Sequence, residues 1–194
     1  MERIIYAYNL ADAALCAFAA IILYIPIRLC FLKAHGKPRK PLLAEAAQML
    51  LAGYIAALVN IVWFPVPRLF TEPEALFASF REGYYAGNSE VLRCLFVDFN
   101  PLLLLHDFEI RANIALFVPL GLLLPFAFRR LKWWQTDLIC LGTTCLVELV
   151  QPLFGRAGDL DDVLMNALGG VIGCALAKLL LTIIRVKREV SYEK

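Results

Sequence analysis

The pattern of hydrophobic and polar positions divides the chain into long apolar blocks separated by polar segments. Five blocks approach about 20 residues, the length that a helix needs to cross the hydrocarbon core of a bilayer. They lie at about 13–32, 42–64, 110–128, 136–153 and 162–184. We therefore expect an all-α integral membrane protein, a bundle of about five transmembrane helices. Residues 1–194 are expected to form a single membrane domain.

Composition agrees with this interpretation and excludes several classes of protein. Hydrophobic residues make up 61% of the chain and charged residues 19%, against about half and about a quarter in soluble domains. No basic, aromatic-interleaved surface is present, so a nucleic-acid partner is not expected. The six cysteines form no CxxC pair, and we expect neither a metal nor another cofactor. The first block is longer than the apolar region of a signal peptide and is interpreted as a retained span.

The positive charges predict the orientation of the spans. Three basic segments alternate with the apolar blocks, and they contain Lys33, Lys37, Arg39, Lys40, Arg129, Arg130, Lys132, Arg185, Lys187 and Arg188. Cytoplasmic loops carry an excess of Lys and Arg. The sequence therefore predicts a multi-pass protein of the cell membrane with its N-terminus outside and its C-terminus in the cytoplasm.

The long segment 65–109 would then lie outside the membrane, between the second and third spans. Its apolar stretches predict one or two short helices on the membrane surface, or a re-entrant segment. Two further charged residues lie close to span ends. We expect Arg28 to extend to the cytoplasmic face and Glu45 to lie at the interface.

Polar residues of three spans should meet below the outer surface. In this orientation Asn113 lies near the outer end of the third span, and Glu148 and Gln151 near that of the fourth. The fifth span begins there with Asp161 and Asp162. Charged side chains are costly within a bilayer, so we expect a polar cavity between these spans. Its expected ligand-binding residues are Asn113, Glu148, Gln151, Arg156, Asp159, Asp161, Asp162 and Asn166.

Helical spacing sharpens this expectation. Asp162, Asn166, Gly169 and Gly173 share a face roughly 60° wide, and so do Thr144, Glu148 and Gln151. Gly169, Gly170 and Gly173 are expected to let the third or fourth span approach closely. Simpler roles are also open, because Asp161 can cap the last span and Asn166 can serve only as a bond between helices.

Several ordered motifs resemble those of the VanZ-like family over about residues 95–180. They are N-I-x-x-F-x-P-x-G at 113–121, E-x-x-Q at 148–151 and R-x-x-D-x-D-D-V-x-x-N-x-x-G-G-x-x-G at 156–173. The element Asn100-Pro101 is similar to one of that family, with its order altered. The resemblance implies a bacterial membrane protein of four or five helices. It also implies a link to the cell envelope and to low-level resistance to teicoplanin, a lipid-bearing glycopeptide.

Three functions remain open on the sequence alone. The leading hypothesis is an outward-facing site for a membrane lipid head group or a lipid-linked cell-wall precursor, possible because amides donate to phosphate or sugar oxygens and Arg156 can hold a phosphate. The second is a membrane enzyme, with Glu148 as acid or base and Asp162 as the other candidate catalytic residue. In that case Asp159 and Asp162 could hold a divalent ion. The third is a structural scaffold subunit. The sequence does not predict the oligomeric state.

Overall fold

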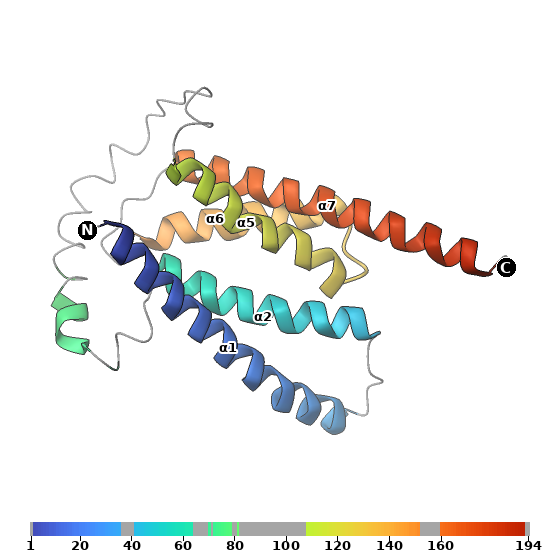
Figure 1. Ribbon diagram of the computed structural model, residues 1–194, viewed down its shortest axis with the longest axis horizontal. Coiled ribbons are helices and arrows are strands. Elements are labelled where there is room, and N and C mark those ends of the chain that lie inside the picture. Colours follow the sequence, from blue (N-terminus) through green and yellow to red (C-terminus); the bar gives the residue numbers. More distant parts are fainter. Residues whose placement is uncertain are drawn as a thin grey trace.

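The computed structural model describes residues 2–35, 41–63, 70, 72–78, 81, 108–151 and 160–192, and every regular element in these ranges is helical. Five long helices lie side by side (Figure 1). In the sequence, a short helix at residues 73–78 lies between the second and the third of them. The protein is therefore an all-α helical bundle. The long helices are α1 (Glu2–His35), α2 (Leu42–Val62), α5 (Phe108–Ala127), α6 (Trp133–Val150) and α7 (Leu160–Tyr192).

Four of these helices have the length and apolar composition of a membrane span, so the expected count of five is one too high by these criteria. The spans are Leu10–His35, Leu42–Val62, Ile110–Ala127 and Leu160–Val186. The exception is α6, which is 18 residues long and includes Asp137 and Glu148. Pro119 and Pro125 lie inside α5 without ending it.

The mean hydropathy of α6 is low because the helix contains polar residues. Several of these residues point into the bundle. Thr136, Thr144 and Glu148 are buried, whereas Leu138, Leu146 and Leu149 are exposed. Hydropathy averages over all faces of a helix, so an inward polar face lowers the average while the outward face remains apolar. The surface that α6 presents outward is thus compatible with lipid.

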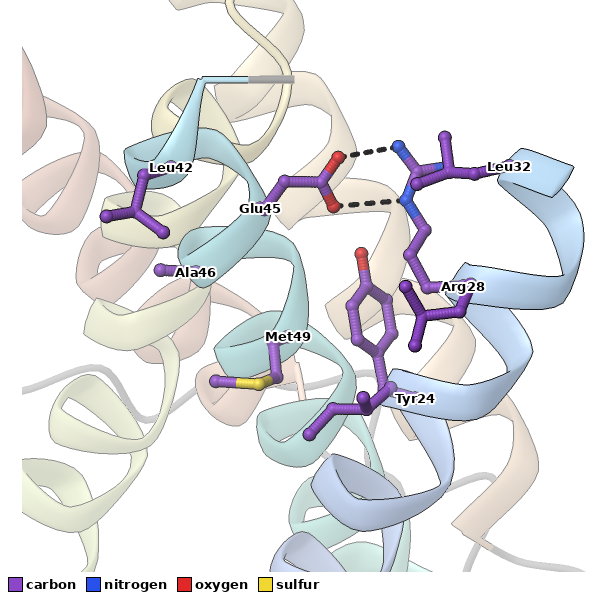
Figure 2. A pocket seen from close by; sticks show the side chains of 9 residues that line it. Tyr24, Arg28, Leu32, Leu42, Glu45, Ala46 and Met49 are labelled. Atoms are coloured by element: carbon purple, nitrogen blue, oxygen red, sulfur yellow. Dashed lines mark hydrogen bonds and ion pairs between the residues drawn. The ribbon is translucent and has the colours of Figure 1, made fainter. Parts of the chain in front are cut away.

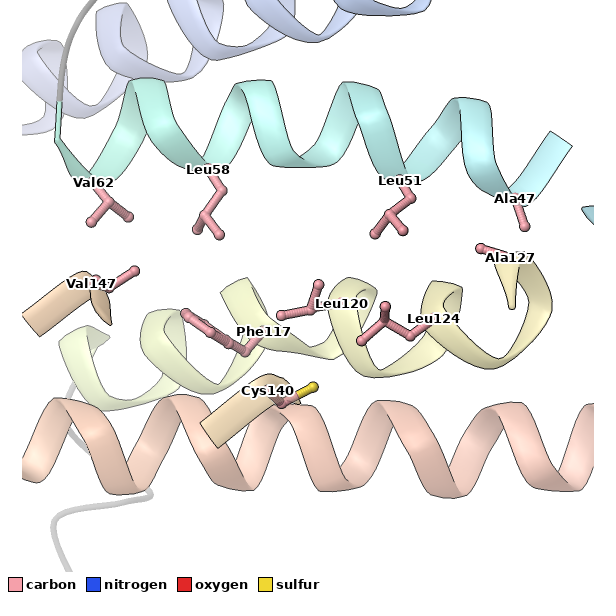
Figure 3. Packing of buried hydrophobic residues seen from close by; sticks show 10 residues of the cluster. All are labelled: Ala47, Leu51, Leu58, Val62, Phe117, Leu120, Leu124, Ala127, Cys140 and Val147. Atoms are coloured by element: carbon pink, nitrogen blue, oxygen red, sulfur yellow. The ribbon is translucent and has the colours of Figure 1, made fainter. Parts of the chain in front are cut away.

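The helix at the centre of the bundle is α5, which packs against α2, α6 and α7. Phe117 of α5 is fully buried. It lies in a cluster whose members from α2 and α5 face each other along the length of the two helices (Figure 3). The helix α1 packs on the other side of α2. The cluster comprises Ala47, Leu51, Leu58, Val62, Phe117, Leu120, Leu124, Ala127, Cys140 and Val147.

Glycines bring the backbones of α5 and α7 into contact. A Cβ at Gly173 would overlap the carbonyl oxygen of Val118, and one at Gly169 would overlap that of Ile114. On α5, a Cβ at Gly121 would overlap the carbonyl oxygen of Gly170. Small residues at such positions let membrane helices approach closely. Of the two partners expected for the glycines of the last span, the third span, α5, makes the backbone contact.

The order of these contacts shows that α5 and α7 run in the same direction, since Ile114 faces Gly169 and Val118 faces Gly173. The chain between them must return along the bundle, and α6 runs that way (Figure 1). The described parts of the three basic segments lie at the same end of the bundle, where α1, α5 and α7 end and α6 begins (Figure 1). The long helices thus alternate in direction, and the basic segments lie at one end of the bundle.

At the basic end, α1 and α2 are joined by an ion pair between two residues expected to lie separately at the interface. Arg28 donates to both carboxylate oxygens of Glu45, from Nε at 3.0 Å and from Nη2 at 2.7 Å (Figure 2). Next to it, Tyr24 donates to Gln48, which donates to the carbonyl oxygen of Ala127 at the end of α5. Polar bonds therefore connect α1, α2 and α5 at this end.

Replacing Gly173 by alanine should destabilise the protein by about 1–3 kcal/mol, the usual effect of overpacking. The added methyl group meets backbone atoms of Val118 and Leu122, which cannot move aside as a side chain can. Thermal unfolding of the purified protein in detergent measures the change.

The matched control is Gly142→Ala on α6, because a Cβ at that position would meet no described atom within 4 Å apart from the neighbouring backbone of α6 itself. Alanine should be neutral there or stabilise the helix by up to about 1 kcal/mol. Equal destabilisation by the two substitutions would contradict the close α5–α7 contact.

Removing one partner of the Arg28–Glu45 pair should cost more than removing both. Arg28→Met leaves the Glu45 carboxylate without its cation. The expected loss of stability lies at the lower end of the about 3–5 kcal/mol typical of a broken buried pair. The lower end applies because the side chains retain 17% and 19% exposure. The double variant Arg28→Met/Glu45→Met should recover most of the loss in the same unfolding assay. A double variant as unstable as the single one would show that the pair is not the source of the effect.

Candidate functional site

Buried and half-buried polar side chains of three helices meet at the end of the bundle opposite the basic segments. We call Asn113 of α5, Thr144 and Glu148 of α6, and Asp162 and Asn166 of α7 the polar seam. Thr144 is 0%, Asn166 3% and Glu148 8% exposed. The seam extends inward from the ends of the helices by about two helical turns.

The first half of the polar seam joins α5 to α7. Asn113 donates from Nδ2 to Oδ1 of Asp162, in the first turn of α7. Helix N-termini favour negative charge, so this is a suitable place for a carboxylate. The contacts of Gly169 and Gly173, about two and three turns further along α7, bring the helices close enough for these two short side chains to meet.

The second half joins α7 to α6. Asn166 donates from Nδ2 to Oγ1 of Thr144 at 3.0 Å. Because α6 and α7 run in opposite directions, Glu148, one turn after Thr144, lies at the level of Asp162, one turn before Asn166. The Oδ1 atom of Asn166 is buried and accepts no hydrogen bond from the described residues. The seam therefore combines carboxylates with an amide acceptor that is open to a donor.

The other expected site residues lie around this seam or outside the described residues. Gln151 is buried at the C-terminal cap of α6. Asp161 is half-buried beside Asp162 in the first turn of α7. Arg156 and Asp159 fall within 152–159, outside the described residues, so their expected roles stay predictions.

Two aromatic side chains, one in α2 and one at its C-terminal cap, support the seam. Trp63 donates from Nε1 to the carbonyl oxygen of Val147, the residue before Glu148, at 3.2 Å. Tyr54 donates to the carbonyl oxygen of Leu116 on α5 at 2.8 Å. The acceptor carbonyls belong to α5 and α6. The two hydrogen bonds therefore connect α2 and its cap to two of the helices that carry the seam.

The seam is suited to a ligand with hydrogen-bond donors. Carboxylates only accept hydrogen bonds when ionised, and an amide oxygen also accepts. Hydroxyl or amine groups satisfy such acceptors. Within the described parts of the chain, no group of three or more His, Cys, Asp or Glu residues is arranged to hold a metal ion.

Comparison with protein families gives one result. A family model described as VanZ/LLP1 matches residues 50–181, more than half of the chain. The chain belongs to the VanZ-like family. This confirms the resemblance found in the motifs. The match also begins earlier than those motifs, so it takes in most of α2, all of α5 and α6, and the first two thirds of α7. Comparison with curated proteins and with solved structures gave no match.

The motif at 113–121 of this VanZ-like protein forms the α5 side of the interface with α7. Asn113 bonds to Asp162, the carbonyl of Ile114 faces Gly169, and Gly121 contacts Gly170. Phe117 fills the core beside them. The spacing of the motif thus corresponds to successive turns of one helix face against its partner.

Sequence reasoning overlooked two residues of this region. Thr144 was placed on the polar face of its span but not among the site residues, although it lies one turn before Glu148 and so shares its face. Gly121 was part of the motif but not of the expected packing set. The signal for Gly121 was present, because a close contact between helices needs a small residue on both sides.

The bond between Asn113 and Asp162 can be measured with a double-mutant cycle. Asn113→Leu removes the donor of a carboxylate in the membrane region, and Asp162→Leu removes the acceptor. The coupling free energy from unfolding in detergent should be about 0.6 kcal/mol, and no more than about 1.7 kcal/mol, as in double-mutant cycles between other membrane helices. A coupling of zero would show that the two side chains act independently.

Proposed function

We propose that this VanZ-like membrane protein uses the polar seam as an outward-facing site for a lipid head group or a lipid-linked cell-wall precursor. The observation that carries the proposal is Asn166. Its side chain is 3% exposed, and its Oδ1 atom has no donor among the described residues. A buried polar atom without a partner is costly, and a ligand that donates a hydrogen bond removes that cost.

The proposed orientation puts the seam at the outer face. Its support is the charge asymmetry of the bundle, since the basic segments lie at one end and the seam at the other. With the positive end in the cytoplasm, the N-terminus lies outside and the C-terminus inside. The seam then meets the leaflet from which cell-wall precursors present their head groups.

The chemistry of the seam favours the sugar or amine part of such a head group. Glu148 and Asp162 supply negative charge and Asn166 an acceptor, and all three match hydroxyl or amine donors. A phosphate would be repelled by the carboxylates unless a cation intervened. Arg156 follows Gln151 closely in the sequence and is the proposed partner of the phosphate of the same ligand.

A contribution to glycopeptide resistance follows from this proposal. Teicoplanin, the antibiotic associated with the VanZ-like family, carries a lipid and acts at the outer face of the membrane. A protein that binds a precursor or a lipid at the outer face of the membrane competes with teicoplanin at the site where the drug acts. The proposed partners are thus a membrane lipid and a lipid-linked precursor.

The test replaces seam residues in bacteria whose teicoplanin susceptibility depends on this protein. Asn166→Leu removes the open acceptor, and Glu148→Gln removes a charge while it keeps the shape. We expect both variants to return the minimum inhibitory concentration of teicoplanin to that of cells without the protein. A glycopeptide that lacks a lipid tail serves as the comparison drug.

The control is Glu74→Gln, the same chemical change at an exposed residue of the short helix 73–78. Protein levels in the membrane must match among the variants. Full resistance with Asn166→Leu and Glu148→Gln at normal levels would refute the proposed site.

The burial of Glu148 favours a second candidate, a membrane enzyme. An ionisable residue within a membrane helix is a functional candidate in its own right. In this case Glu148 would act as an acid or base on the bound head group. Binding of the precursor that survives Glu148→Gln while resistance is lost would favour the enzyme over simple binding. Loss of function only with packing variants such as Gly173→Leu would favour a scaffold.

A further inference from the structure

The basic end of the bundle carries a pocket that the polar seam does not involve. It has a volume of about 320 Å³ and lies between the end of α5, the start of α6 and the C-terminal half of α7. This size is at the lower limit of typical small-ligand pockets. The residues that matter most in its wall are Leu131, Trp133, Thr136, Lys178, Thr182 and Arg185.

The pocket exists because α7 is longer than its neighbour. Gly121 of α5 lies beside Cys174, and the two helices run in the same direction. The last residue of α5, Ala127, therefore lies level with the stretch of α7 between Lys178 and Arg185. Beyond this level α7 continues alone (Figure 1), and the turn at 128–132 covers one side of the space that α5 leaves.

Two cations face this pocket from one side of α7. Lys178, Thr182 and Arg185 are spaced by four and three residues and so share a helix face. Neither Lys178 nor Arg185 forms an ion pair with an acid among the residues that the structure describes. The positive end of α6 begins at Trp133, in the pocket wall, and adds to the field. One acid, Asp137, lies one turn further along α6 and beside Cys174 of the pocket wall. The part of the pocket near Arg185, three turns along α7 from Cys174, is therefore the most positive.

Part of the pocket wall is apolar, and this part continues onto the lipid-facing surface. Leu131 and Trp133 line the pocket, and Trp133, Ile183 and Val186 are exposed. Tryptophan is typical of the level at which lipid head groups lie. A ligand that fits both features carries an anionic group for the cations and a hydrocarbon tail for the surface beside them.

We propose that this pocket binds the head group of an anionic phospholipid from the leaflet at the basic end, with its phosphodiester between Lys178 and Arg185. Basic pockets between membrane helices on the cytoplasmic side are suited to such head groups. The site lies at the opposite end of the bundle from the polar seam and does not depend on the function proposed for the seam.

The experiment is a titration of the purified full-length protein in mild detergent with phosphatidylglycerol or phosphatidylcholine, followed by native mass spectrometry. The wild type should bind one phosphatidylglycerol more tightly than any further lipid, and phosphatidylcholine more weakly. Lys178→Gln/Arg185→Gln should weaken the first binding step about 25-fold, since each cation contributes about fivefold near a membrane surface.

The matched control is Arg129→Gln/Arg130→Gln, which removes the same charge from two exposed residues of the neighbouring turn. Its affinity should stay close to that of the wild type. Equal weakening in both double variants would show attraction to diffuse surface charge and overturn the proposal. So would equal binding of phosphatidylcholine by the wild type.

Two further experiments test whether the bound phosphate comes from a lipid and whether the loss of binding could result from misfolding. Inorganic phosphate and glycerol phosphate should fail to displace the lipid, and displacement by either would assign the site to a soluble anion instead. Thr182→Trp keeps both cations but fills the pocket, so it should also weaken binding. Unchanged binding in that variant would overturn the proposal. Glu148→Gln should leave the titration unaltered, which separates this site from the seam.

Discussion

The contact between the backbones of α5 and α7 is the constraint on which the rest of the bundle depends. It requires glycine at 121, 169 and 173, because a Cβ at any of them would overlap a carbonyl oxygen of the partner helix. Only at such a short separation can the short side chains of Asn113 and Asp162 reach each other. A wider spacing would place water or lipid between them, and a carboxylate facing lipid is costly.

The same contact determines the role of α6. Since α5 and α7 run in the same direction, the helix between them in sequence must run back and pack along the pair. Its buried residues Thr136, Cys140 and Thr144 face them, and Cys140 lies against Gly170. A helix so placed can carry Thr144 and Glu148 into the bundle while leucines face outward. The low hydropathy of α6 is therefore a consequence of its position.

The sequence was sufficient to predict the helices and the gathering of polar residues at one end. Apolar length and the alternation of basic segments are properties of single segments and their order, so they can be read directly. The partners of Arg28 and Asn166 could not be predicted, because they depend on how helices rotate against each other. Without that rotation, Glu45 was expected only at the interface and not in a pair with Arg28, and Thr144 was not included in the site. Helical spacing gives a face, and only packing gives the residue opposite that face.

The arrangement of polar groups along the bundle bears on what the protein can do with a lipid. Between the seam at one end and the basic pocket at the other, the buried layer contains Phe117, Leu120 and Cys140. A charged head group moving past these apolar side chains would lose its hydration, which is strongly unfavourable. If both proposed sites bind lipid, this separation favours head groups held where they already lie, each in its own leaflet. On the proposed function, the protein therefore acts on the precursor at the membrane surface and does not carry it across.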